Sequence, residues 1–184
     1  MTNTRRPYTG NRDAPAKSVT PAVRRFQDYM RFYGFAASGG LNVRVMRTAP
    51  EWAKKLPPTD PRVRKYLSVH ATGRAFDARN NSPKALRSWF DLMVDFADEL
   101  HLEELHDYSY KAPGADRAYG RGYRCSRGGG PTKGVRIYTA TNNAGSIGGR
   151  WLHVEIAPGT TPAQIDAGFK TMISALAAAL APRI

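Results

Sequence analysis

The sequence predicts an α+β domain in which helices flank a small, mostly antiparallel central sheet. Three observations support this class. Two amphipathic segments begin with the pairs Thr20-Pro21 and Ser82-Pro83, which are typical of helix starts. Short segments with alternating apolar and polar residues lie elsewhere in the chain, as in half-buried strands. The 184 residues are enough to bury one core without disulfide bonds.

Residues 1–18 are predicted to form a flexible basic arm, either mobile or draped over the rest of the chain. They are polar and basic, and Pro7, Gly10 and Pro15 interrupt regular structure. Residues 19–184 are predicted to form a single domain.

The first helix is predicted to begin after Thr20 and to bury a stripe of side chains at helical spacing. That stripe consists of Val23, Phe26, Tyr29, Met30 and Tyr33. A second helix is predicted over residues 82–100. Its apolar positions are Leu86, Trp89, Phe90, Met93 and Phe96. A third helix follows Thr161-Pro162 and includes the alanine-rich tract near the end of the chain.

Strands are predicted where apolar and polar residues alternate or where β-branched residues gather. The first lies within residues 41–48 and ends at Arg47. Two more cover residues 135–141 and 150–157. Residues 107–131 are rich in Gly, Tyr and Arg and show no clear period, so no element is predicted there.

Composition restricts the possible functions. Lys and Arg number 28 against 15 Asp and Glu, and the net charge of +13 favours a polyanionic partner such as nucleic acid or an anionic cell envelope. Because Cys125 is the one cysteine, a metal site would have to use His, Asp and Glu. The first residues lack the apolar region of a secretory signal, and no run of about 18 apolar residues predicts a membrane span.

Two residues of the kinds that bind metals lie in the stretch S-V-H-A-T-G-R-A-F-D, residues 68–77. His70 and Asp77 are separated by Gly73, which permits the tight turn that would bring both side chains to one ion. A catalytic zinc ion takes three protein ligands and keeps one position open. The stretch therefore supplies two of the three ligands.

The third ligand is predicted in the strand-like stretch W-L-H-V-E, residues 151–155. His153 alternates there with apolar neighbours, so Trp151 and Glu155 project from the same face of the strand. A carboxylate beside a histidine ligand is suited to orient that ligand or to accept a proton.

Together these stretches resemble the zinc peptidases that cleave D-alanyl-D-alanine or L-alanyl-D-glutamate bonds in peptidoglycan, whose fold is shared with hedgehog signalling domains. The resemblance covers about residues 42–156 and includes the pattern S-x-H-x-x-G-x-A-x-D. The matching residues are Ser68, His70, Gly73, Ala75 and Asp77. The resemblance implies Zn²⁺ held by His70, Asp77 and His153.

The resemblance also implies roles for other residues. Arg47 would face the substrate and stabilise negative charge. The family's usual carboxylate base, three residues before the last histidine ligand, is replaced by Arg150. Glu155 is therefore the predicted general base. The predicted substrate-binding residues are Ser68, Arg47, Tyr108 and Trp151.

Other titratable residues lie in L-H-L-E-E-L-H-D-Y, residues 100–108. Glu103 and Glu104 are predicted to be surface charges at a helix end, whereas His106 and Asp107 could border a cleft. The following Tyr- and Arg-rich segment is suited to grip a sugar-peptide polymer or to stack on single-stranded nucleic acid.

The predicted function is hydrolysis of stem-peptide amide bonds in bacterial peptidoglycan by a zinc-dependent peptidase-like domain, as in a phage endolysin or a virion-associated hydrolase. Such a protein would be made in the cytoplasm and act at the cell wall or within the virion. Its partners would be peptidoglycan, the anionic cell envelope and other virion proteins. The alternatives are a catalytically impaired, zinc-stabilised virion protein and a basic nucleic-acid-binding protein.

Overall fold

The computed structural model describes residues 4–38, 40–128, 132–143 and 145–180. The elements, in chain order, are α1 (Pro21–Phe32), β1 (Ala36–Ser38), α2 (Glu51–Lys54), η1 (Pro61–Tyr66), η2 (Val69–Thr72), β2 (Ala75–Arg79), α3 (Pro83–Asp95), β3 (Leu102–Asp107), β4 (Arg121–Arg124), η3 (Cys125–Arg127), β5 (Val135–Ile137), β6 (Trp151–Ile156) and α4 (Pro162–Leu180), where η denotes a 3₁₀ helix.

The described residues form one six-stranded sheet in the order β1-β2-β6-β3-β4-β5. Every neighbouring pair of strands is antiparallel. The predicted α+β class with an antiparallel sheet is therefore confirmed. The last strand in the chain, β6, lies between β2 and β3, so it brings two distant parts of the sequence together at the centre of the sheet.

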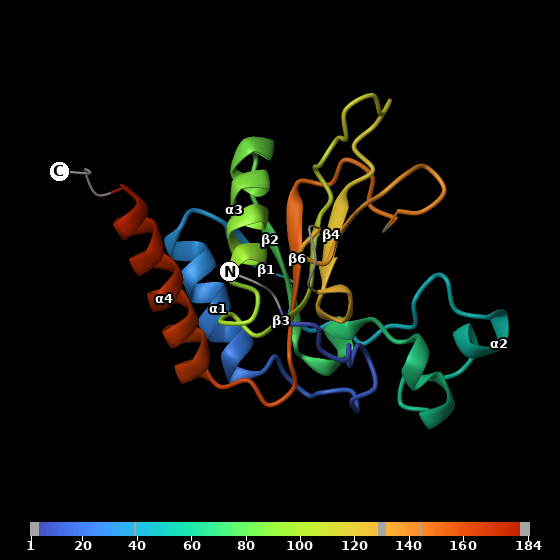
Figure 1. Ribbon diagram of the computed structural model, residues 1–184. Helices are drawn as coiled ribbons and strands as arrows, with labels where there is room; N and C mark the ends of the chain where they lie inside the picture. The colour runs from blue at the N-terminus through green and yellow to red at the C-terminus, as the bar shows by residue number, and fades with distance from the viewer. Residues whose placement is uncertain (1–3, 39, 129–131, 144, 181–184) are drawn as a thin grey trace.

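The sheet has one apolar and one polar face because successive residues of a strand point to opposite sides. On β2 and β6 the buried residues Phe76, Ala78, Leu152 and Val154 face the main core. Helices α1 and α3 pack against this face and α4 packs against α1, and Figure 1 shows the three helices together on one side of the strands. The residues that alternate with the apolar ones project from the other face, where they are free to form a functional site.

All three predicted helices are present and begin at the predicted caps. The side-chain oxygens of Thr20, Ser82 and Thr161 each accept a hydrogen bond from the backbone N–H three residues later. The first backbone N–H groups of a helix have no acceptor within the helix, and such a cap provides an acceptor for one of them. Helix α3 ends at Asp95, earlier than predicted.

The predicted strand at residues 41–48 is wrong. Only an isolated bridge between Val45 and Leu67 occurs there, and Leu41, Val43 and Met46 are exposed. The alternating pattern in this segment therefore does not correspond to a buried face. The edge strand β1 lies instead just after α1, where three small residues gave no period to detect.

Strand β3 was also missed because its sequence L-E-E-L-H-D places two glutamates in succession. Glu103 and Glu104 are 2% and 4% exposed, so the prediction that they are surface charges at a helix end is wrong. A register shift between Leu102 and Glu104 interrupts the strand's alternation. Both carboxylates have cationic partners, the buried Arg74 for Glu103 and the half-buried Arg124 for Glu104, which the local sequence does not reveal.

The N-terminal segment is draped across the domain and hydrogen-bonded to it. The guanidinium of Arg74, 4% exposed, donates to Asp13 at 2.6 Å, to Glu103 at 3.2 Å and to the carbonyl oxygens of Gly10 and Ile156. One buried cation therefore ties the segment to β2, β3 and β6. In the described part of the chain, no helix combines the length and the apolar character needed to cross a membrane.

Candidate metal centre

The three predicted ligands converge on the polar face of the sheet. Asp77 on β2 is the cross-strand partner of His153 on β6, so their side chains project side by side. His70 comes from η2, which ends at Gly73 in a left-handed conformation with φ of +71°. That turn leads the chain directly into β2 and places His70 over the Asp77–His153 pair.

The possible ligand atoms lie close enough together to share one metal ion. His70 Nε2 and His153 Nδ1 are 3.1 Å apart, and Asp77 Oδ1 lies 3.2 Å from His153 Nδ1 and 3.6 Å from His70 Nε2. Bonds of 2.0–2.1 Å in a tetrahedral site separate neighbouring ligand atoms by about 3.3 Å. The three residues therefore form a group that could hold a metal ion, with a set of donors that suits zinc.

The protonation of His153 explains why this group favours a cation. Its Nε2 lies 2.8 Å from Glu155 Oε1 and donates its proton to that carboxylate, while Nδ1 faces Asp77 and His70. Burial lowers the pKa of His153, but hydrogen bonds and charge interactions with Asp77 and Glu155 outweigh it and raise that pKa to about 10. A proton or a metal ion between these electron-rich atoms relieves their repulsion.

Glu155 is the orienting carboxylate of His153 in this geometry. It is 3% exposed, and one of its oxygens accepts from the nitrogen of His153 that points away from the other two ligands. Its second oxygen lies 2.8 Å from the hydroxyl of Tyr8 in the N-terminal segment. Burial and the charges of Glu155 and Glu104 raise the pKa of Tyr8, so Tyr8 stays a neutral donor.

A third histidine lies beside the metal group. His106 on β3 is the cross-strand partner of His153, and the centres of their rings are 5.7 Å apart. Its Nε2 is 3.1 Å from Glu104 Oε1 and 3.3 Å from the hydroxyl of Tyr138. Its Nδ1 is buried and has no hydrogen-bond partner among the described residues. If Nε2–H donates to Glu104, Nδ1 is left with a free lone pair.

The metal group opens into a cavity of about 650 Å³. This cavity is also lined by all the predicted substrate-binding residues, which are Arg47, Ser68, Tyr108 and Trp151. The rings of Tyr108 and Trp151 are 5.2 Å apart. Arg47 is exposed and lies in a turn, not in a strand as predicted. Arg150 is exposed and is not among the lining residues, so it does not occupy the place of a base.

Sequence reasoning missed four contributors to this site, which are Tyr8, Glu104, His106 as a neighbour of the metal, and Arg124. Glu104 and His106 lie two residues apart on β3 and project from one face, so recognition of this strand would have identified both. The sequence around Tyr8 does not indicate a role in the site, because only the fold of the draped segment brings this residue to the sheet.

Many side chains of the Tyr- and Arg-rich segment after β3 form contacts within the protein. Tyr123 is fully buried in the core. Arg121 forms ion pairs with Asp91 and Asp107, and Arg124 forms one with Glu104. These side chains are therefore not free to grip a polymer as a continuous surface.

No model of a protein family matches this chain, and no curated protein or solved structure shows a significant similarity to it.

Proposed function

We propose that this protein is a zinc-dependent peptidase with the hedgehog/DD-peptidase fold that hydrolyses stem-peptide amide bonds of peptidoglycan. The observation that carries the proposal is the spacing of His70, Asp77 and His153 at the floor of an open cavity. Three ligands on rigid elements beside a cavity are typical of a catalytic site, whereas structural zinc sites have four protein ligands.

A zinc ion in this group would polarise the scissile carbonyl and lower the pKa of a water molecule in its open position. The chain's own residues must then handle the proton. His106 is the candidate we choose, because it lines the cavity with its ring centre 5.7 Å from that of His153, Glu104 holds its Nε2, and its Nδ1 has no partner among the described residues. We assign Nδ1 of His106 as the atom that accepts the proton and returns it to the leaving amine, in place of the Glu155 predicted from sequence.

Other residues would bind and orient the substrate. Arg44 and Arg47 line the rim of the cavity and are exposed, so their guanidinium groups are available to a carbonyl or carboxylate next to the scissile bond. Tyr108 and Trp151 offer ring faces for the peptide or for a sugar. In contrast, Glu155 and Tyr8 would act through His153, because Glu155 accepts a hydrogen bond from His153 Nε2 and Tyr8 donates one to Glu155.

The net charge of +13 supports a target in the anionic cell envelope, where binding should weaken as salt screens the attraction. The proposal places the protein among phage lysins or virion-associated hydrolases. A catalytically impaired member of the same fold is the second candidate, because both oxygens of Glu155, the carboxylate predicted as base, are held by His153 and Tyr8. A nucleic-acid-binding protein would leave the metal group without a role.

Digestion of purified peptidoglycan tests the proposal directly. The zinc-loaded protein should release new amine groups, 1,10-phenanthroline should abolish the release, and added Zn²⁺ should restore it. His70→Ala and Asp77→Asn should each lose bound zinc. His101→Asn is the matched control, because His101 lies outside the site and Asn tolerates its φ of +53°. Stoichiometric zinc without any release of amines would establish the impaired protein instead.

His106→Gln separates the proton acceptor from the metal ligands. This variant should keep its zinc but lose about 10²–10⁴-fold in the rate of peptidoglycan hydrolysis, as removal of a general base does. The rate and the zinc content would be measured on the same preparation. Wild-type turnover by His106→Gln would show that another group accepts the proton.

A further inference from the structure

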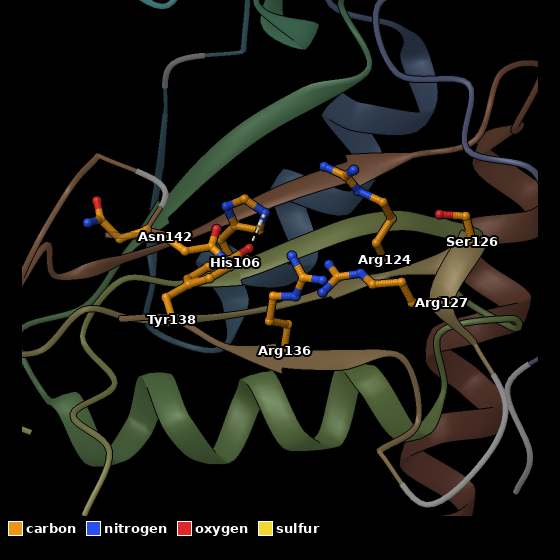
Figure 2. Close-up of a pocket in the computed structure, with 8 residues that line it drawn as sticks. His106, Arg124, Ser126, Arg127, Arg136, Tyr138 and Asn142 are labelled. Atoms are coloured by element: carbon orange, nitrogen blue, oxygen red, sulfur yellow. Dashed lines mark hydrogen bonds between the residues drawn. The ribbon is translucent and has the colours of Figure 1, made fainter. Parts of the chain in front are cut away.

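A second cavity, of about 420 Å³, lies next to the metal cavity on the same face of the sheet. The two cavities share His106 and Arg124 as lining residues. Three arginines line the second cavity, Arg124 on β4, Arg127 in η3 and Arg136 on β5. Figure 2 shows the guanidinium groups of Arg127 and Arg136 close together, whereas that of Arg124 points away from them. The described residues that line it include no Asp or Glu.

The position of this cavity follows from the register of the strands. His153, His106, Gly122 and Arg136 are successive cross-strand neighbours from β6 to β5, so the row begins at the metal group and ends at an arginine. Gly122 provides the space between them, since a Cβ atom there would lie 2.3 Å from the hydroxyl of Tyr138. The hydroxyl occupies that space and contacts His106, as the dashed line in Figure 2 indicates.

The charge in the cavity is only partly balanced. Glu104 pairs with Arg124, at 2.6 Å from its Nη2. No carboxylate of the described residues forms an ion pair with Arg127 or Arg136. Like charges that share one pocket repel each other unless an anion lies between them. The remaining polar groups at the wall belong to Ser126, Tyr138, Asn142 and Asn143, which can donate hydrogen bonds to oxygen atoms.

We propose that this arginine pocket, defined by Arg124, Arg127 and Arg136, binds an oxyanion, either a carboxylate or a phosphate. The planar guanidinium groups match the oxygen pairs of both anions in a bidentate manner. Binding requires no metal ion. Since the pocket adjoins the metal cavity, the anion would be an acidic group on the same molecule as the scissile bond, a second step that rests on the proposed peptidase function.

Calorimetric titration of the full chain with glutarate and with inorganic phosphate, at constant ionic strength, tests the pocket. Zinc is first removed with 1,10-phenanthroline, which is uncharged at neutral pH, because phosphate also binds zinc and an anionic chelator would compete for the pocket. Saturable binding is expected. Tighter binding of glutarate indicates a carboxylate of a peptide, and tighter binding of phosphate indicates a phosphate group.

Arg127→Gln and Arg136→Gln should each weaken this binding about tenfold or more, because each removes a charged donor. Arg136→Lys keeps the charge but loses the planar, bidentate arrangement of N–H donors. Its affinity for the anion should therefore lie between that of the wild type and that of Arg136→Gln. Arg24→Gln is the matched control, since it removes one exposed charge on α1, far from the pocket, and should change the affinity less than twofold.

Two results would overturn the inference. One is the absence of saturable binding of both anions to the wild type. The other is equal weakening by Arg24→Gln and Arg136→Gln, which would show attraction to the overall charge alone. If the protein binds the anions but does not cleave peptidoglycan, the proposed peptidase function is wrong, whereas the assignment of the arginine pocket as an anion site is still supported.

Discussion

At the scale of single residues, the metal group depends on side chains that hold its ligands in place. His153 can present Nδ1 to a metal ion only while its Nε2 carries a proton, and Glu155 enforces that state. The hydroxyl of Tyr8 in turn donates a hydrogen bond to the second oxygen of Glu155. In contrast, Nδ1 of His70 has no hydrogen-bond partner among the described residues. His153 is thus the more firmly oriented of the two histidine ligands.

Glu155→Gln tests this arrangement. The neutral amide should orient His153 more weakly, so zinc affinity should fall by about 10–100-fold, the usual cost of losing such a partner. Competition with a chromophoric chelator measures that affinity. Glu51→Gln, on the exposed helix α2, is the control and should leave it unchanged. Unaltered zinc affinity together with lost hydrolysis would instead favour Glu155 as the base.

At the scale of elements, the turn between η2 and β2 positions two ligands at once. Gly73 has a positive φ, and the draped segment passes so closely that a Cβ atom at Gly73 would lie 2.4 Å from the carbonyl oxygen of Ser18. Thr20 donates its backbone N–H to the carbonyl oxygen of Gly73, which joins the start of α1 to the same turn. The glycine of the opening motif is therefore needed both for its conformation and for its lack of a side chain.

Gly73→Ala should therefore lower the free energy of unfolding by more than the strain of a positive φ alone, which costs about 1–2 kcal/mol. Gly159→Ala is the matched control, because Gly159 has a similar φ of +74° but nothing within 4 Å of its Cβ position. Urea denaturation of both variants measures the difference. Equal losses would show that the contact with Ser18 relaxes without cost.

At the scale of the whole molecule, the draped N-terminal segment completes the domain. It supplies Tyr8 to the metal site, and Asp13 and a backbone carbonyl to the buried guanidinium of Arg74. A buried cation that loses its partners is strongly destabilising, because neither water nor another anion replaces them. Of the two alternatives predicted for this segment, mobile or draped, the contacts correspond to the draped one.

Deletion of residues 1–14 should lower stability by about 3 kcal/mol or more, as breaking a buried ion pair does. It removes Arg5, Arg6, Arg12 and Asp13 and so lowers the net charge by two. Arg12→Ala combined with Lys17→Ala is the control, since it removes the same charge from exposed positions. The melting temperatures of the deletion and of the double variant, measured by thermal unfolding, distinguish the two effects. If both proteins melt alike, the segment contributes charge and not contacts.

Much of the fold was predictable because it is encoded by residues close together in sequence. The caps at Thr20, Ser82 and Thr161 are local patterns, and so is the alternation that gives β6 its two faces. The segment at residues 41–48 shows the limit of such patterns. It alternates like a strand, but no neighbouring strand is there to pair with it.

The sequence by itself determined the three candidate ligands, the spacing of His70 and Asp77 around Gly73, and the helices on one side of the sheet, because these depend on local backbone and side-chain preferences. Only the tertiary structure decided which groups surround the ligands. Pairing of β6 with both β2 and β3 set His106 and Glu104 beside His153, and burial of Arg74 drew Tyr8 into the site. Such contacts join segments far apart in the chain, so packing of the whole molecule, and not any local pattern, selects them.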